Sequence, residues 1–200
     1  MFTKDGYTEK LTAALDGMAD ALEGIEKDDY STYRKFMAPG TTLGPMDGTL
    51  RTKHGKGRAQ EELCGALARI DSERDAARKE VMDEMAKPPS ADAMRYIEAL
   101  RGRGNVLPEE VAAGMRAYGG NWTAYRELRD MIRAAIDSGE YGTVPDDIPQ
   151  HELDGALEYI DSEARYARGI ARDGVPVPGR VDHGKMRSKL SFSKFLDGIM

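Results

Sequence analysis

The sequence predicts an all-α protein, a bundle of about six helices with a long Gly- and Pro-rich loop and a basic C-terminal tail. Three observations support this fold class. Apolar residues recur at helical spacings of three and four along most of the 200 residues. Aromatic residues make up 7% of the chain and charged residues 32%, which is typical of helices rather than strands. One long helix occurs twice, because residues 60–78 and 150–168 share 12 of 19 aligned residues.

The N-terminal segment, residues 1–37, predicts a helix over 8–26 with Thr8 as its N-cap, followed by a shorter helical piece. Its apolar stripe consists of Leu11, Leu15, Met18, Leu22 and Ile25. Residues 38–58 are so rich in Gly, Pro and Thr that neither periodicity continues, and they predict a mobile basic loop. The last part of this loop, 49–58, carries four basic side chains and no acidic one.

Residues 59–172 predict the helical core. Its expected helices cover 59–86, 91–101, 108–118, 122–137 and 150–172. Ser90 is the predicted N-cap of the second of these helices and Asn121 that of the fourth, while Pro108 occupies a first helical position. The four segments are compatible with a single domain overall.

Residues 173–200 predict a basic amphipathic tail. Cationic and aromatic side chains alternate there, which is typical of a docking peptide whose charge steers and whose rings anchor. The predicted partner-binding residues are Lys185, Arg187, Lys189, Phe192, Lys194 and Phe195. A disordered terminus is the alternative interpretation.

The repeat is interpreted first as a packing element. Its shared Leu, Ala and Ile residues fall on one helical face, and a glycine stands beside that face in both copies. Because glycine weakens a helix, its double occurrence predicts a notch where another backbone approaches closely. The predicted notch consists of Gly65, Ala66, Gly155 and Ala156. The shared polar run IDSE, 70–73 and 160–163, could instead bind a cation or a basic partner.

Residues 108–137 have the helix, short glycine turn and second helix of a DNA-binding helix-turn-helix. The side chains that could meet phosphates or base edges are Arg126, Arg129 and Arg133. Glu127 and Asp130 interrupt this basic face, and the chain as a whole has a net charge of −6. A plain helical hairpin is therefore favoured over a nucleic-acid reader.

The segment 106–132 resembles a stretch of small helical proteins encoded among the head genes of tailed phages and prophages. The match consists of Tyr118, Asn121, Trp122, Thr123, Arg126 and Leu128. The segment departs from the pattern at Leu107 and Gly120. This resemblance implies a virion component or a role in head assembly, and it implies no catalytic residue.

No catalytic, cofactor or metal signature occurs in the sequence, so we expect no enzymatic activity and no cofactor. A signal peptide and a membrane-spanning run are not apparent, which predicts a cytoplasmic or virion-associated protein. The leading hypothesis is a structural or assembly protein with protein partners, as a homo-oligomer or a capsid-type assembly. The alternatives are a helix-turn-helix regulator and an acidic mimic of nucleic acid, since residues 134–164 carry nine acidic side chains and no basic one.

Overall fold

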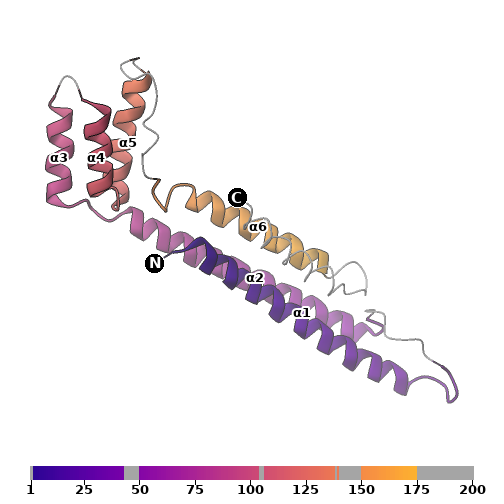
Figure 1. Cartoon of the computed structure of the whole chain (residues 1–200). Helices are drawn as coiled ribbons and strands as arrows, with labels where there is room; N and C mark the ends of the chain where they lie inside the picture. Colours follow the sequence, from indigo (N-terminus) through magenta and orange to yellow (C-terminus); the bar gives the residue numbers. More distant parts are fainter. Residues whose placement is uncertain (1, 43–49, 104–105, 138, 140–149, 175–200) are drawn as a thin grey trace. The chain divides into compact units, whose positions relative to one another are not determined.

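The computed structural model describes residues 2–42, 50–103, 106–137, 139 and 150–174, which form six helices and no strand (Figure 1). The helices are α1 (Lys4–Lys35), α2 (Lys53–Met85), α3 (Ala91–Arg101), α4 (Pro108–Tyr118), α5 (Trp122–Asp137) and α6 (Ala156–Gly174). The predicted all-α fold class is confirmed. The described residues separate into two compact units, unit 1 within Met1–Ala77 and Glu158–Met200 and unit 2 within Arg78–Leu157.

In unit 1, α1 and the first part of α2 lie side by side in opposite directions (Figure 1). Near the start of α1, Lys10 Nζ lies 3.3 Å from Glu73 Oε2. Near its end, Asp28 Oδ2 lies 3.3 Å from Arg58 Nη1. Residue numbers therefore rise along α1 as they fall along α2, and the two helices form an antiparallel hairpin.

In unit 1, the parts of the two repeat copies that lie on α2 and α6 contact each other. Arg168 of α6 reaches Asp71 of α2 with Nη1 and Oδ1 2.9 Å apart. The copies also bury the same aligned positions on one helical face. The buried pairs are Leu63 and Leu153, Ala66 and Ala156, Ile70 and Ile160, and Ala77 and Ala167.

Helix α1 is one continuous helix whose N-cap is Thr3 rather than the predicted Thr8. The Thr3 hydroxyl accepts a hydrogen bond from the Gly6 amide at 3.2 Å. The Thr8 side chain instead forms hydrogen bonds within α1 and to α6, where its hydroxyl lies 2.7 Å from the Tyr159 hydroxyl. The buried face of α1 continues past Ile25 to Glu26 and Asp29, so packing against neighbouring helices carries α1 past its glycines to Lys35.

Helix α2 begins at Lys53, so the last six residues of the predicted mobile loop are helical. The reason is a carboxylate from another helix. Asp29 of α1 is 5% exposed and accepts hydrogen bonds from the backbone amides of Arg51 and Thr52 and from the Thr52 hydroxyl. Thr52 is then positioned as N-cap, with its hydroxyl 3.0 Å from the Gly55 amide.

Helix α6 begins at Ala156, six residues later than predicted. Gly155 has a φ of +72°, a left-handed conformation that interrupts a right-handed helix. His151 organises the turn before it, because its Nδ1 accepts a hydrogen bond from the Leu153 amide at 3.0 Å and its carbonyl accepts one from the Asp154 amide at 2.9 Å. The aligned glycines of the two copies thus have different backbone conformations.

Unit 2 contains α3, α4 and α5, whose bounds agree with the prediction. The Ser90 hydroxyl accepts from the Ala93 amide at 3.1 Å, and the Asn121 side-chain oxygen accepts from the Ala124 amide at 3.0 Å, so both predicted caps are confirmed. Figure 1 draws the three helices alongside one another. Their buried core consists of Ala93, Ile97, Leu100, Val111, Met115, Ala124, Tyr125, Leu128 and Ile132.

One glycine of this core lies in a close helix contact. A Cβ added to Gly114 would lie 2.4 Å from Cε1 of Tyr96 and 3.3 Å from Cδ2 of Leu128. The Tyr96 ring is held in place because its hydroxyl donates to the Glu110 carbonyl at 2.6 Å. Any side chain at position 114 therefore separates α3 from α4.

We expect Gly114→Ala to lower the free energy of unfolding by about 1 to 3 kcal/mol, as overpacking of a fixed core does. The matched control is Gly65→Ala, which places the same methyl group on a helix surface with no described atom within 4 Å. Better helix propensity should make that variant more stable, by up to about 1 kcal/mol. Urea unfolding followed by circular dichroism, with Trp122 fluorescence as the reporter on unit 2, measures both. A Gly114→Ala protein as stable as the parent would contradict the contact.

Candidate functional site

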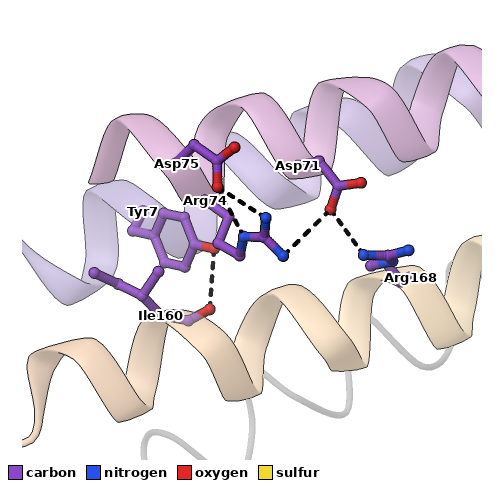
Figure 2. A network of polar contacts seen from close by, with 6 residues as sticks. All are labelled: Tyr7, Asp71, Arg74, Asp75, Ile160 and Arg168. Carbon is purple, nitrogen blue, oxygen red and sulfur yellow. Dashed lines mark hydrogen bonds and ion pairs between the residues drawn. The ribbon is translucent and has the colours of Figure 1, made fainter. Parts of the chain in front are cut away.

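Tyr7 of α1, which is 3% exposed, contacts the second copy of the repeat (Figure 2). Its hydroxyl donates to the Ile160 carbonyl of α6 at 3.1 Å. Burial raises the pKa of Tyr7 far above its usual range, because the phenolate would lose its hydration. Arg74 opposes that increase. The phenol therefore stays protonated and keeps donating throughout the physiological pH range.

Carboxylates of both IDSE runs lie near enough to this tyrosine to raise its pKa. Those that raise the Tyr7 pKa are Asp161, Glu163 and Glu73, in that order. The first two belong to the second copy of the repeat and the third to the first copy. The two polar runs therefore converge on α1 in the same unit, where Arg74 supplies the neighbouring positive charge.

Two arginines pair with Asp71 of the first IDSE run (Figure 2). Asp71 Oδ1 lies 2.9 Å from Arg168 Nη1 and 3.7 Å from Arg74 Nη1. Arg74 also holds Asp75, with Nη2 2.8 Å from Oδ1. These side chains are partly hydrated, so each pair stabilises the protein by roughly 0 to 1 kcal/mol. The arrangement joins α2 to α6, and its chemistry is that of an ionic clamp.

The cation site considered for the IDSE runs does not form among the described residues. No group of three or more His, Cys, Asp or Glu side chains there could hold a metal ion. The acidic side chains of the first run contact basic side chains of the same chain instead. The polar part of the repeat thus serves helix packing, as its apolar part does.

The predicted packing notch is wrong for both glycines. Gly65 and Gly155 are exposed, and within the described structure nothing lies within 4 Å of a Cβ built at either position. Gly65 stands one position before the buried Ala66 on α2, and that rotation of about 100° turns it toward solvent. Gly155 lies in the turn before α6. Ala66 and Ala156 are fully buried and do belong to the packed face. Gly114 is a closely packed glycine, which sequence reasoning missed although it lies beside Met115 on an apolar stripe.

The three arginines predicted for nucleic-acid contact have different environments on α5. Arg129 is half-buried, with its guanidinium 5.7 Å from the Tyr125 ring centroid and Nη1 3.2 Å from Asp154 Oδ1. Through the contact with Asp154, Arg129 stabilises the turn before α6. Arg126 and Arg133 are exposed and lie seven residues apart, on one face of the helix.

The residues that carry the resemblance to phage head-gene proteins have structural roles in unit 2. The Asn121 side-chain nitrogen donates to the Lys87 carbonyl at 3.0 Å, which ties the start of α5 to the end of α2. Tyr118 packs against Tyr96 with ring centroids 5.5 Å apart. Trp122 lies against His151, with ring centroids 5.2 Å apart. The segment therefore acts as a helix junction.

Several residues with a fixed role were not predicted, among them Tyr7, Asp29 and His151. Tyr7 had a readable signal, since it lies one turn before Leu11 on the same stripe. Asp29 and His151 act on residues that are brought near only by folding. The predicted partner-binding residues lie outside the described residues; they are Lys185, Arg187, Lys189, Phe192, Lys194 and Phe195.

The chain matches no family model, and it has no significant match among curated proteins or solved structures. Among the described helices, none has the length and apolar character that a membrane crossing requires.

Tyr7→Phe is expected to lower the free energy of unfolding by about 0.5 to 1.5 kcal/mol, because it removes a buried hydrogen bond and keeps the ring. Tyr166→Phe is the matched control, since Tyr166 lies on α6 with 44% of its surface exposed. That change should leave stability within about 0.5 kcal/mol of the parent. Urea unfolding by circular dichroism compares the two. Equal effects of the two substitutions would refute the role of the Tyr7 hydroxyl.

We call the hydrogen bonds from Arg51 and Thr52 to the Asp29 carboxylate the Asp29 clamp. This clamp predicts that the free energy of unfolding depends on pH. Burial by itself raises the pKa of Asp29, but hydrogen bonds from Thr52 and Arg51 outweigh it and hold the pKa below its ordinary value of 3.8. The stability that the folded-state carboxylate provides is therefore complete above pH 3.8 and is lost as the pH falls through the lower folded-state pKa.

Accordingly, Asp29→Asn should cost about 1 to 3 kcal/mol at neutral pH, and its difference from the parent should shrink in acid. Asp28→Asn is the neighbouring control, because Asp28 is exposed and only pairs with Arg58. Its effect should stay below about 1 kcal/mol. Denaturant unfolding at a series of pH values tests both variants, and a pH-independent cost of Asp29→Asn would contradict the clamp.

Proposed function

We propose that the protein is a non-enzymatic structural protein that acts through helix packing, as an assembly component of a phage or prophage particle. The observation that carries this proposal is the use of the doubled segment. Both copies bury their apolar positions, and their polar runs interact with basic and phenolic groups in unit 1. The internal repeat, which is the most distinctive feature of the sequence, therefore supports a structural role for the protein.

The dimensions of the α1 and α2 helices also support a structural role. These helices contain 32 and 33 residues, so each is about 50 Å long at 1.5 Å per residue. The Asp29 clamp holds the start of α2 against α1, and the Tyr7 and Asp71 contacts attach α6. Helices joined at several points along their length are stiff, and stiff helical elements suit an assembly subunit.

Self-association is the first measurable consequence. Sedimentation velocity over a range of protein concentrations should show species whose mass is a multiple of the 22.0 kDa chain. A protein that stays at the mass of one chain over the whole range would contradict the homo-oligomeric form of the proposal.

The particle assignment has a separate test. Mass spectrometry of virions purified from a strain that carries the gene should detect peptides of this chain, and they should stay with the particles through a density gradient. Head proteins of the same particles provide the positive control. Peptides found only in the lysate supernatant would contradict a virion component, whatever the result of sedimentation.

A further inference from the structure

Basic side chains gather where α1 ends and α2 begins. We call this region the hairpin end and define it as residues 28–42 and 50–58. It contains six Lys and Arg residues against two Asp residues and no Glu. Asp29 of α1 contacts Thr52, which directly precedes α2. The basic residues that follow Asp29 and those that follow Thr52 therefore lie in the same part of unit 1. A chain with a net charge of −6 thus concentrates positive charge at one place.

Four of these cations have no partner within the described part of the chain. No ion pair or side-chain hydrogen bond there engages Arg34, Lys35, Lys53 or Lys56, and all four are exposed. Elsewhere, basic residues commonly pair with acidic ones across or along helices. Examples are Lys10 with Glu73, Lys27 with Glu23, Lys79 with Asp83, Lys87 with Glu84 and Arg101 with Glu127. These four side chains therefore give the hairpin end a positive charge that no described acidic side chain neutralises.

The position of Lys53 and Lys56 is unfavourable for the helix that carries them. A helix N-terminus bears a partial positive charge, so cations in its first turn are destabilising and acidic residues stabilising. The first turn of α2 has no acidic residue. The Asp29 carboxylate of α1 offsets part of this cost, but it bonds to Arg51 and Thr52 and pairs with neither lysine. Both lysines are therefore available to an external anion.

An aromatic ring accompanies this charge. Phe36, the residue after α1, is 83% exposed and is the one large apolar side chain recorded as exposed in the described hairpin end. Nearby, the Arg51 guanidinium lies 5.4 Å from the Tyr33 ring centroid and 5.7 Å from that of Tyr30. A protein interface would require a larger apolar centre than one ring. Cations around a single exposed ring suit a nucleic-acid strand, whose phosphates meet the cations while a base stacks on the ring.

We infer that the hairpin end binds single-stranded nucleic acid through its phosphate backbone. Arg34, Lys35, Lys53 and Lys56 would contact phosphates, and Phe36 would stack on a base. This binding is independent of the proposed structural role, since it uses none of the side chains that join α1, α2 and α6. It also differs from the helix-turn-helix hypothesis, whose exposed arginines are Arg126 and Arg133 on α5.

The test is the fluorescence anisotropy of a labelled oligothymidylate with the full-length chain at several salt concentrations. Four phosphate contacts predict a slope of about −2.8 in a plot of log affinity against log salt, or about a 50-fold loss between 50 and 200 mM salt. Lys53→Gln with Lys56→Gln should reduce the slope by about 1.4. The same double variant should have an equal or higher melting temperature, because it removes cations from a helix N-terminus.

The matched control is Arg126→Gln with Arg133→Gln, which changes the net charge by the same amount on α5. It should leave the affinity within about twofold and the slope unchanged. Phe36→Ala should weaken binding of the single strand and leave binding of a duplex of the same length unchanged.

Three outcomes would overturn the inference. The first is no binding at the lower salt concentration. The second is an equal loss in the two double variants, which would mean that only overall charge matters. The third is a hairpin-end variant that changes self-association and leaves oligonucleotide binding intact, which would make this surface an interface for acidic protein.

Discussion

The burial of one stripe of α2 against α1 and α6 is the constraint on which unit 1 depends. The stripe consists of Ala59, Leu63, Ala66, Ile70 and Ala77, and its members are nearly or fully buried. Three of the five are alanines, so neighbouring backbones can come close without a steric clash. On α6, the second copy of the repeat buries Ile160 and Ala167, which align with Ile70 and Ala77 of that stripe. A single segment used twice therefore supplies two of the three helices that enclose this core.

Polar contacts then fix how the helices are aligned along their length. Apolar stripes at a helical spacing allow neighbouring helices to slide by a turn with little change in buried area. Asp29 at one end of α1 and Tyr7 at the other remove that freedom, since each has its hydrogen-bond partners in a single alignment. Both groups are buried, so a slipped alignment would leave them unsatisfied and costly.

The ion pairs of the protein distinguish side chains with a structural role from those that remain available to a partner. The polar runs of the repeat resemble a binding motif, but they interact with Arg74, Arg168 and Tyr7 of the same unit. Four cations of the hairpin end, Arg34, Lys35, Lys53 and Lys56, have no such partner among the described residues, and the two lysines at the start of α2 lie where a helix tolerates cations least. A surface that is not neutralised from within is the better candidate for contact with another molecule.

Local sequence determined the all-α fold class and the bounds of α3, α4 and α5. The reason is that the caps of α3 and α5, Ser90 and Asn121, bond to amides three residues away, so the needed partners are adjacent in sequence. Tertiary structure alone decided where α2 and α6 begin. Asp29 reaches Thr52 across 23 residues, and His151 lies against Trp122 from 29 residues away. It also decided that Gly114, and neither Gly65 nor Gly155, has a neighbour close by, because a glycine's surroundings depend on which helix is packed over it.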